Sequence, residues 1–321
     1  MLLGNAAVQH PQATELLSLA KWIGQHTGAS VGVLGEAANS VGAQLVDAVP
    51  GAGGLDVAGM LAAPRKAMLL LNVEPVLDLA DPLAAHAALQ QAEMVVAFTS
   101  FKDAAVEGAD VLLPIAPFTE TSGTFVNAEG RVQGFHGVVK PLGDTRPAWK
   151  VLRVLGNLVG LSGFDFETTE QVRSEALGDE AMLSARLSND VHVSATATAV
   201  AQDQQGLQRL ADVPLYATDA LVRRATSLQL TADARAPQAG LAPGLWNQLG
   251  MQPGDRVRIT QGAGQVTLAA RLEATLAEGC ARVPAGTAET AGLGAMTGHL
   301  TVERLAASSE SLLAKESGVA A

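Results

Sequence analysis

A predominantly apolar run at residues 67–73, bounded by Glu74 and Pro75, constrains the fold more than any other feature of the sequence. A strand without polar alternation is typical of a parallel sheet whose two faces are both covered. Further apolar segments follow at 94–98 and 111–113. Because parallel strands need helical crossovers between them, this spacing predicts an α/β fold with a doubly wound, mostly parallel sheet.

Helix signals occur where such a fold requires them. Asp81 followed by Pro82 predicts an N-cap and a first helical turn, and we expect the helix to reach about Ala92. Nearer the start of the chain, residues 11–26 place leucine, alanine and isoleucine on one face, and Gly28 supplies the stop. The alternation of helix and strand therefore begins early in the sequence.

The loop after a short strand predicted at 31–34 is the first candidate binding site, with Gly35, Glu36 and Asn39. Doubly wound sheets bind ligands beyond the carboxyl ends of their strands. The loop lacks the glycine spacing that lets a backbone approach a pyrophosphate, and Glu36 would repel phosphate. We therefore favour helix capping by Asn39 or Ser40 over a nucleotide site, and treat the loop as a vestigial crevice.

Glu74 is the second crevice candidate, because it follows the strand predicted at 67–73. A carboxylate there repels an anionic cofactor unless a cation neutralises it. Neither crevice strand is followed directly by arginine or lysine, and Arg65 and Lys66 are the nearest cations that folding can bring to Glu74. We therefore predict that nucleotides such as NAD and GDP bind no more tightly than about millimolar.

The residues give little support to metal or catalytic chemistry. The one cysteine, Cys280, cannot supply the thiolates of an iron–sulfur cluster, and the six histidines include no pair spaced i, i+4. Asp103, Glu107 and Asp110 form an acidic group that loop capping explains, and no nucleophile elbow surrounds Ser122. We predict no metal site and no catalytic residue.

After the predicted strands at 67–73, 94–98 and 111–113, a hairpin and a helix interrupt the alternation of strand and helix. Residues 124–133 form two short strands around a turn in which Gly130 adopts positive φ. Farther along, Asp144 or Thr145 caps a helix whose apolar face spans 151–159. These elements complete the first predicted domain.

We expect four parts in the chain. Closely spaced strands joined by glycine turns predict a small β-barrel as the second domain. The expected parts are an α/β domain at 1–161, a polar helical connector at 162–213, the barrel domain at 214–305 and a tail at 306–321.

Charge and hydropathy argue against a nucleic-acid-binding surface, a membrane span and a signal peptide. With 21 basic and 32 acidic residues, the net charge is −11, and no basic run is longer than Arg223-Arg224, so we expect no nucleic-acid interface. The most apolar stretch is too short to cross a bilayer. No basic residue precedes Lys21, so we expect no signal peptide.

One long motif resembles a known family. Ala-Asp-Val-Leu-Leu-Pro at 109–114 and Thr-Glu-Thr-Ser-Gly-Thr-Phe-Val-Asn-Ala-Glu-Gly-Arg-Val-Gln at 119–133 are similar to a signature of the molybdopterin oxidoreductase superfamily. Within it, Trp149 with its leucine-rich helix and Leu-Val-Arg-Arg-Ala at 221–225 resemble the G-subunit family of bacterial NADH:quinone oxidoreductase, respiratory complex I. Leu-Gly-Met-Gln-Pro-Gly-Asp-Arg-Val at 249–257 resembles the start of the double-psi barrel that closes molybdopterin enzymes.

The resemblance implies the C-terminal portion of a large iron–sulfur subunit. In that family the 2Fe-2S and 4Fe-4S clusters lie in the N-terminal region, whose ligands cannot be placed on this sequence. The implied role is structural and concerns subunit assembly, with no redox centre in this segment. The implied partners are the subunit's own N-terminal half and other peripheral-arm subunits, on the cytoplasmic side of the inner membrane. Relatives that hold the cofactor commonly carry Asn-Pro where this chain has Glu74-Pro75, and a carboxylate cannot donate to phosphate.

Two other functions stay open at this point. The chain resembles half of a molybdopterin-dependent oxidoreductase of the formate dehydrogenase type, which binds a pterin dinucleotide when joined to its N-terminal part. A free-standing nucleotide-binding module would instead bind NAD or a nucleotide alone. Ligand binding by the chain distinguishes these functions from the structural one.

Overall fold

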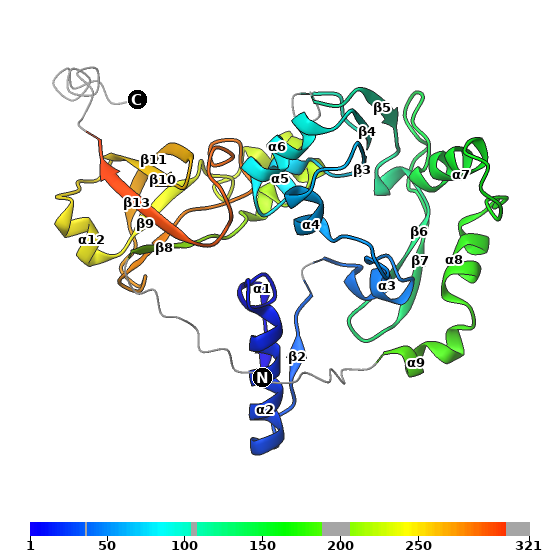
Figure 1. Ribbon diagram of the computed structural model, residues 1–321, viewed down its shortest axis with the longest axis horizontal. Coiled ribbons are helices and arrows are strands. Elements are labelled where there is room, and N and C mark those ends of the chain that lie inside the picture. The colour runs from blue at the N-terminus through cyan, green and yellow to red at the C-terminus, as the bar shows by residue number, and fades with distance from the viewer. Residues whose placement is uncertain (36, 104–107, 188–205, 306–321) are drawn as a thin grey trace. The chain divides into compact units, whose positions relative to one another are not determined.

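The computed structural model describes residues 1–35, 37–103, 108–187 and 206–305, and the chain forms two compact units (Figure 1). The first unit combines Met1–Gly59, Phe98–Phe101 and Leu113–Ala201. The second combines Met60–Ala97, Lys102–Leu112 and Gln202–Ala321. The chain therefore enters each unit more than once.

The first unit begins with two short parallel strands connected by helices. β1 (Leu2–Leu3) pairs with β2 (Gly32–Val33), and the connection contains α1 (Asn5–Val8) and α2 (Ala13–Thr27). The helix expected at 11–26 is thus confirmed. Gly28 ends it with φ of 72°, a left-handed conformation that glycine adopts without steric cost.

The predicted hairpin is also confirmed. β6 (Gly123–Val126) and β7 (Val132–Phe135) pair in antiparallel fashion. In the turn, Asn127 Oδ1 accepts hydrogen bonds from the backbone N–H groups of Glu129 and Arg131 at 3.0 and 2.9 Å. Gly130 has φ of 80°, so the turn needs a residue that tolerates the left-handed region.

Short helices complete the first unit. They are α3 (Ser40–Leu45), η2 (Phe118–Glu120), α7 (Ala148–Leu158), α8 (Thr169–Leu177), η3 (Glu180–Met182) and α9 (Leu183–Arg186). The caps predicted at Asp144 and Thr145 are wrong, because Pro147 is the N-cap residue of α7 and Thr145 Oγ1 donates to Leu142 O at 2.7 Å. A capping box of Thr168 and Gln171 begins α8.

A small apolar core joins four of these elements. Leu45 of α3, Val126 of β6, Leu177 of α8 and Leu183 of α9 are buried together. Burying aliphatic side chains in this way contributes about 1.5–3 kcal/mol each. The core therefore fixes α8 beside the β6–β7 hairpin.

A three-stranded sheet falls mostly within the second unit. Its strands have the order β3 (Ala67–Leu71), β4 (Met94–Thr99) and β5 (Val111–Pro114), and the nearby helices are α4 (Val57–Ala62), α5 (Pro75–Asp78) and α6 (Pro82–Gln91). The last two residues of β4 and of β5 belong to the first unit. Asp81 caps α6 by accepting a hydrogen bond from Ala84 N at 3.0 Å, as predicted. The three strands and α6 thus lie where the sequence predicted them, whereas α4 and α5 were not predicted.

The burial predicted for the first of these strands is wrong. β3 is an edge strand, and its residues alternate between half-buried and exposed, with Leu69 57% and Leu71 49% exposed. An apolar run does not show how many neighbours a strand has, because that number is fixed by the order of strands in the sheet.

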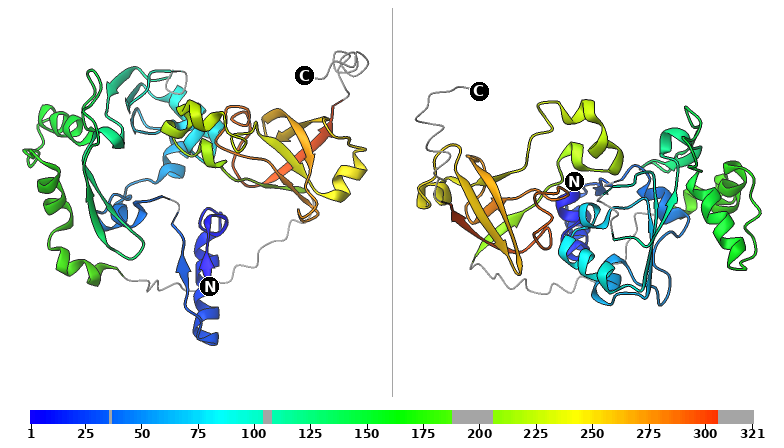
Figure 2. Two further views of the ribbon diagram at one scale, coloured as in Figure 1. Left: turned by 180° about the vertical axis from the view of Figure 1, so that it is seen from behind. Right: turned by 90° about the horizontal axis from the view of Figure 1, so that it is seen from above.

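The predicted β-barrel is confirmed as a closed six-stranded barrel (Figures 1 and 2). Around the barrel the strands are β10 (Arg256–Gln261), β11 (Gly264–Leu272), β9 (Gln238–Leu241), β12 (Cys280–Arg282), β8 (Leu207–Leu210) and β13 (His299–Arg304). Pairing is parallel for β9 with β11 and for β8 with β12, and antiparallel elsewhere. Because β8 belongs to the barrel, the barrel begins before Pro214.

The barrel interior follows the alternation predicted for strands. Val257 and Ile259 of β10 and Leu268 and Ala270 of β11 point inward. The helix α12 (Pro243–Gln248) precedes β10 and contributes Leu245 and Trp246 to the edge of this core.

A buried arginine connects the barrel to the loop between β12 and β13. The Arg209 guanidinium donates hydrogen bonds to Gln261 Oε1 and to the backbone oxygens of Val283, Pro284, Gly294 and Ala295, at 3.0 to 3.3 Å. Desolvation lowers the pKa of Arg209 to about 10, because burial disfavours the charged form. The carbonyl dipoles around the cation offset part of that cost.

We predict that Arg209→Met destabilises the protein by about 3 kcal/mol, because it leaves buried carbonyl groups without donors. Denaturant titration measures the change in the free energy of unfolding. Arg258→Met is the matched control, since Arg258 lies on the barrel surface and pairs with Glu303 at 3.4 Å. The control should cost about 0–1 kcal/mol. Equal losses for the two variants would contradict a structural role for Arg209.

We predict that Gly130→Val destabilises the fold by about 1–2 kcal/mol or more, because valine is strained at positive φ and its Cβ meets the Leu187 side chain. Gly160→Val is the control, since Gly160 also has positive φ, 78°, but no atom lies within 4 Å of the place that a Cβ would take. Thermal unfolding of both variants separates backbone strain from the collision. An unchanged melting temperature for Gly130→Val would contradict the assigned turn.

Candidate functional site

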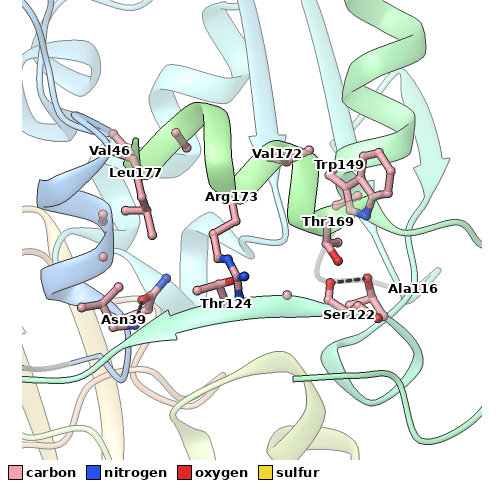
Figure 3. A pocket seen from close by; sticks show the side chains of 18 residues that line it. Asn39, Val46, Ala116, Ser122, Thr124, Trp149, Thr169, Val172, Arg173 and Leu177 are labelled. Atoms are coloured by element: carbon pink, nitrogen blue, oxygen red, sulfur yellow. Dashed lines mark hydrogen bonds between the residues drawn. The ribbon is translucent and has the colours of Figure 1, made fainter. Parts of the chain in front are cut away.

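A cavity of about 470 Å³ lies in the first unit, between helix α8 and strand β6 (Figure 3). The lining is mostly apolar. It consists of Asn39, Gly42, Ala43, Val46, Ala48, Ala116, Thr121, Ser122, Gly123, Thr124, Val126, Ala148, Trp149, Thr169, Val172, Arg173, Ala176 and Leu177. A volume of this size is within the range of small-molecule sites.

Asn39 lies at one end of the cavity, and its role differs from the predicted one. The residue precedes α3, but its side chain does not cap that helix. Instead Asn39 Oδ1 accepts a hydrogen bond from Val126 N at 2.8 Å. The amide therefore connects the start of α3 to β6, and short-range capping rules could not reveal a partner so distant in the sequence.

Arg173 is the charged residue in this lining, and in Figure 3 its guanidinium extends from α8 toward Thr124 of β6. The other polar groups are hydroxyls, the Asn39 amide and the Trp149 indole. No histidine, cysteine or carboxylate lines the cavity within the described residues. The arrangement offers hydrogen bonds and apolar contact, and it provides no acid, base or activated nucleophile.

The second place of interest is a group of five charged residues in the second unit, which we call the Glu74 cluster: Glu74, Asp78, Asp103, Arg223 and Arg224. Glu74 is the N-cap residue of α5, directly after β3, and is only 3% exposed. Arg223 Nη2 and Nε donate to Glu74 Oε2 at 2.7 and 3.1 Å, and Arg224 Nη2 donates to Oε1 at 2.6 Å. Both carboxylate oxygens are therefore occupied by arginine.

The two arginines also bind the outer carboxylates of the cluster. Arg223 Nη2 lies 2.9 Å from Asp78 Oδ1, and Arg224 contacts both oxygens of Asp103 at 2.7 Å. The hydrogen bond with Asp103, and then that with Glu74, raise the pKa of Arg224 above its ordinary value. The cluster is thus a connected network of charge-assisted hydrogen bonds.

The segment that carries the arginines is held by its own hydrogen bonds. It contains η4 (Leu215–Ala217), α10 (Ala220–Arg224) and α11 (Thr226–Gln229). Asp219 Oδ1 caps α10 by accepting from Leu221 N and Val222 N at 2.8 and 2.9 Å. Gln229 Nε2 donates to Tyr216 O at 2.9 Å. The guanidinium groups are therefore positioned by a prefolded segment.

The structure does not bring the described residues of the predicted crevice together in one site. Gly35 is an exposed loop residue, and Glu36 lies outside the described residues. Asn39 belongs to the cavity of the first unit, whereas Glu74 belongs to the cluster in the second. The four crevice candidates are therefore not one site within either unit.

Arg65 and Lys66, the two cations that folding could have brought to Glu74, have other partners. Lys66 pairs with Glu93 at 3.3 Å, and Arg65 Nε donates to Ala63 O at 2.9 Å. The Glu74 charge is offset instead by Arg223 and Arg224, which lie 149 and 150 residues later. The sequence signals for them were that no basic run in the chain is longer than this pair, and that the pair belongs to the Leu-Val-Arg-Arg-Ala segment that resembles the G-subunit family.

The acidic group predicted beside these strands has structural partners. Asp110 Oδ2 accepts a hydrogen bond from Val95 N at 2.7 Å, which joins the start of β5 to β4. Asp103 belongs to the Glu74 cluster. Glu107 lies outside the described residues. The described part of the chain contains no group of three or more histidine, cysteine or acidic side chains that could hold a metal ion, and none of its helices is long and apolar enough to span a membrane.

Residues 2–158 match the molybdopterin oxidoreductase family model, so this part of the chain belongs to the molybdopterin oxidoreductase family. Among named relatives, the G subunit of NADH-quinone oxidoreductase from Mycobacterium tuberculosis is 31% identical over 230 residues, which cover 68% of this chain and 27% of the relative. The protein of the same name from Streptomyces coelicolor is 32% identical over 208 residues, covering 63% and 24%. The chain thus spans about a quarter of the length of these relatives.

Other similarities are shorter or concern the fold. A putative formate dehydrogenase of Staphylococcus aureus is 36% identical over 75 residues, which cover 23% of this chain and 8% of that protein. Acetylene hydratase from Pelobacter acetylenicus superposes with a TM-score of 0.55 and 16% identity, over 77% of this chain and 46% of that one. At this identity the superposition shows a shared fold.

The family name implies a molybdopterin cofactor, and the Glu74 cluster does not fit one. In a doubly wound sheet a dinucleotide's diphosphate is held beyond the carboxyl ends of strands by N–H donors. After β3 the side chain that lies there is a buried carboxylate, and the neighbouring guanidinium groups already bind carboxylates. We therefore derive no chemistry through this cofactor.

We predict that Glu74→Ala destabilises the protein by about 3–5 kcal/mol, because it leaves two partly buried cations without their shared counter-ion. The change is read from the denaturation midpoint. Glu93→Ala is the control, since Glu93 is 69% exposed in its pair with Lys66 and should contribute about 0–1 kcal/mol. Similar midpoints for the two variants would show that the cluster does not stabilise the fold.

Proposed function

We propose that the chain is a structural and subunit-assembly segment of the large iron–sulfur subunit of an NADH-quinone oxidoreductase, and that it carries no redox centre itself. The proposal has the support of two relatives, both G subunits of NADH-quinone oxidoreductase, that align with about two thirds of the chain. In this role the segment supports electron transfer from NADH to quinone through its contacts with the rest of the assembly.

The observation that carries the structural role is that arginines bind both carboxylate oxygens of Glu74. The carboxyl end of β3 is a position where an α/β fold of this kind places a ligand. Here Arg223 and Arg224 donate hydrogen bonds to both carboxylate oxygens of Glu74. The same arginines also bind Asp78 and Asp103. An incoming diphosphate would have to displace buried ion pairs while facing three carboxylates.

The alternative is a molybdopterin-dependent oxidoreductase half of the formate dehydrogenase type. The short similarity to a putative formate dehydrogenase favours it, as does the fold shared with acetylene hydratase. A cofactor-binding half needs a diphosphate site, and the Glu74 cluster opposes one. We therefore prefer the structural role, and we expect the double-psi connection of the barrel to be a feature of the fold under either function.

The proposed role implies particular partners and a location. The expected partners are an N-terminal region carrying the 2Fe-2S and 4Fe-4S clusters and other peripheral-arm subunits. The expected location is the cytoplasmic side of the inner membrane, as a peripheral part of the complex. Neither nucleic acid nor a membrane span of its own has a part in this proposal.

An epitope tag on the chromosomal gene tests assembly. After mild solubilisation of membranes and native electrophoresis, we expect the tagged protein to migrate with the band that oxidises NADH. Deleting residues 206–305 should remove the tagged protein from that band, whereas the tag alone should not. Migration with formate dehydrogenase activity, or apart from both activities, would contradict the proposal.

Ligand binding tests the absence of a dinucleotide site. Titration calorimetry of the purified chain with NAD, GDP and a pterin dinucleotide should give dissociation constants weaker than about 1 mM. Micromolar affinity for the pterin dinucleotide would favour the alternative, and micromolar affinity for NAD would favour a nucleotide-binding module.

A further inference from the structure

The Glu74 cluster has the parts of an anion-binding site, and the anion is a side chain of the same protein. Arg223 and Arg224 are adjacent residues near the end of α10, yet both guanidinium groups reach one carboxylate. Planar guanidinium groups match the geometry of carboxylate and phosphate equally well. The same pair of donors could therefore hold a phosphate group in the place of Glu74.

The arginines are positioned independently of Glu74. Arg223 Nη1 donates to Ala217 O at 2.8 Å, and Arg224 Nη1 donates to Ala220 O at 2.9 Å. Both acceptors belong to the segment that carries the arginines, which Asp219 caps. Removing the Glu74 side chain therefore leaves these backbone contacts in place, so the donors stay close to their present arrangement.

The net charge of the cluster, in contrast, opposes the binding of an external anion. With all groups ionised, two arginines face three carboxylates, so the cluster carries one net negative charge. One side of the cluster faces solvent, because the Asp103 side chain is 46% exposed. The Glu74 side chain lies at the buried side and is 4% exposed. An oxyanion can approach from the Asp103 side, but it meets excess negative charge and an occupied receptor.

We infer that Arg223 and Arg224 form a latent phosphate-binding site that Glu74 keeps closed. The site would take a phosphate or diphosphate group once the Glu74 carboxylate is removed. This inference rests on the geometry of the cluster and goes beyond the proposed assembly role, which native electrophoresis tests separately.

The test is titration of the full chain with inorganic pyrophosphate at low ionic strength. We expect Glu74→Ala to bind about tenfold or more tightly than the unaltered protein, because a buried negative charge is lost and space opens beside two guanidinium groups. The double variant Glu74→Ala with Asp78→Asn removes a second negative charge and should bind more tightly again. Added sodium chloride should weaken both gains.

The barrel offers a matched control. Glu273 also lies between two arginines, with Arg282 Nε at 2.8 Å and Arg271 Nη2 at 3.2 Å, but Arg271 is half exposed. Glu273→Ala makes the same change in net charge elsewhere in the chain. We expect it to leave pyrophosphate affinity within about twofold of the unaltered protein. Adding Arg224→Met to Glu74→Ala should abolish the gain.

Every outcome of the pyrophosphate titrations either supports or overturns the proposed latent site. Equal affinity for the unaltered protein, Glu74→Ala and Glu273→Ala would overturn the inference, and so would tight binding by the unaltered protein. Because Glu74→Ala is expected to be destabilised, its melting temperature is measured with and without pyrophosphate. A rise in melting temperature confined to this variant supports the site. If Glu74→Ala does not fold, Glu74→Gln is titrated instead, because it removes the same negative charge and keeps the size of the side chain, and the absence of any gain over the unaltered protein overturns the inference.

Discussion

The buried Glu74 carboxylate, held between Arg223 and Arg224, is the interaction on which the second unit most depends. Transferring three charged groups from water costs several kcal/mol each unless their hydrogen bonds are remade inside the protein. The cluster remakes them through short contacts of 2.6 to 3.1 Å. The consequence is that the turn after β3 and the segment between β8 and β9 are fixed to each other, although they are far apart in the sequence.

Arg209 shows a different solution to the same physical problem. It is as deeply buried as Glu74, but its partners are the Gln261 amide oxygen and backbone carbonyl groups. Carbonyl dipoles stabilise a cation less than a carboxylate does, which is why burial lowers the pKa of Arg209 while the carboxylates of the cluster raise that of Arg224. One arginine thus orders a long loop, and the other two hold a carboxylate.

These features also separate fold from chemistry. Open α/β sheets bind ligands beyond the carboxyl ends of their strands. Here charged side chains of the chain itself occupy the end of β3. The cavity beside β6 lies in the motif that resembles the family, yet its lining contains no acid or base. Among the described residues, neither place brings a nucleophile together with a general acid or base, so the shared fold by itself does not specify a reaction.

Local rules determined what the sequence could predict, and long-range pairing decided the rest. Asp81 and Gly28 at helix ends, Gly130 in its turn and the alternation in β10 act within a few residues, so the elements they define were predicted correctly. The exposure of Leu69, the contact of Asn39 with Val126, and the pairing of Glu74 with Arg223 required the folded chain. Strand order and the approach of residues 149 positions apart are set by tertiary packing, which no local spacing encodes.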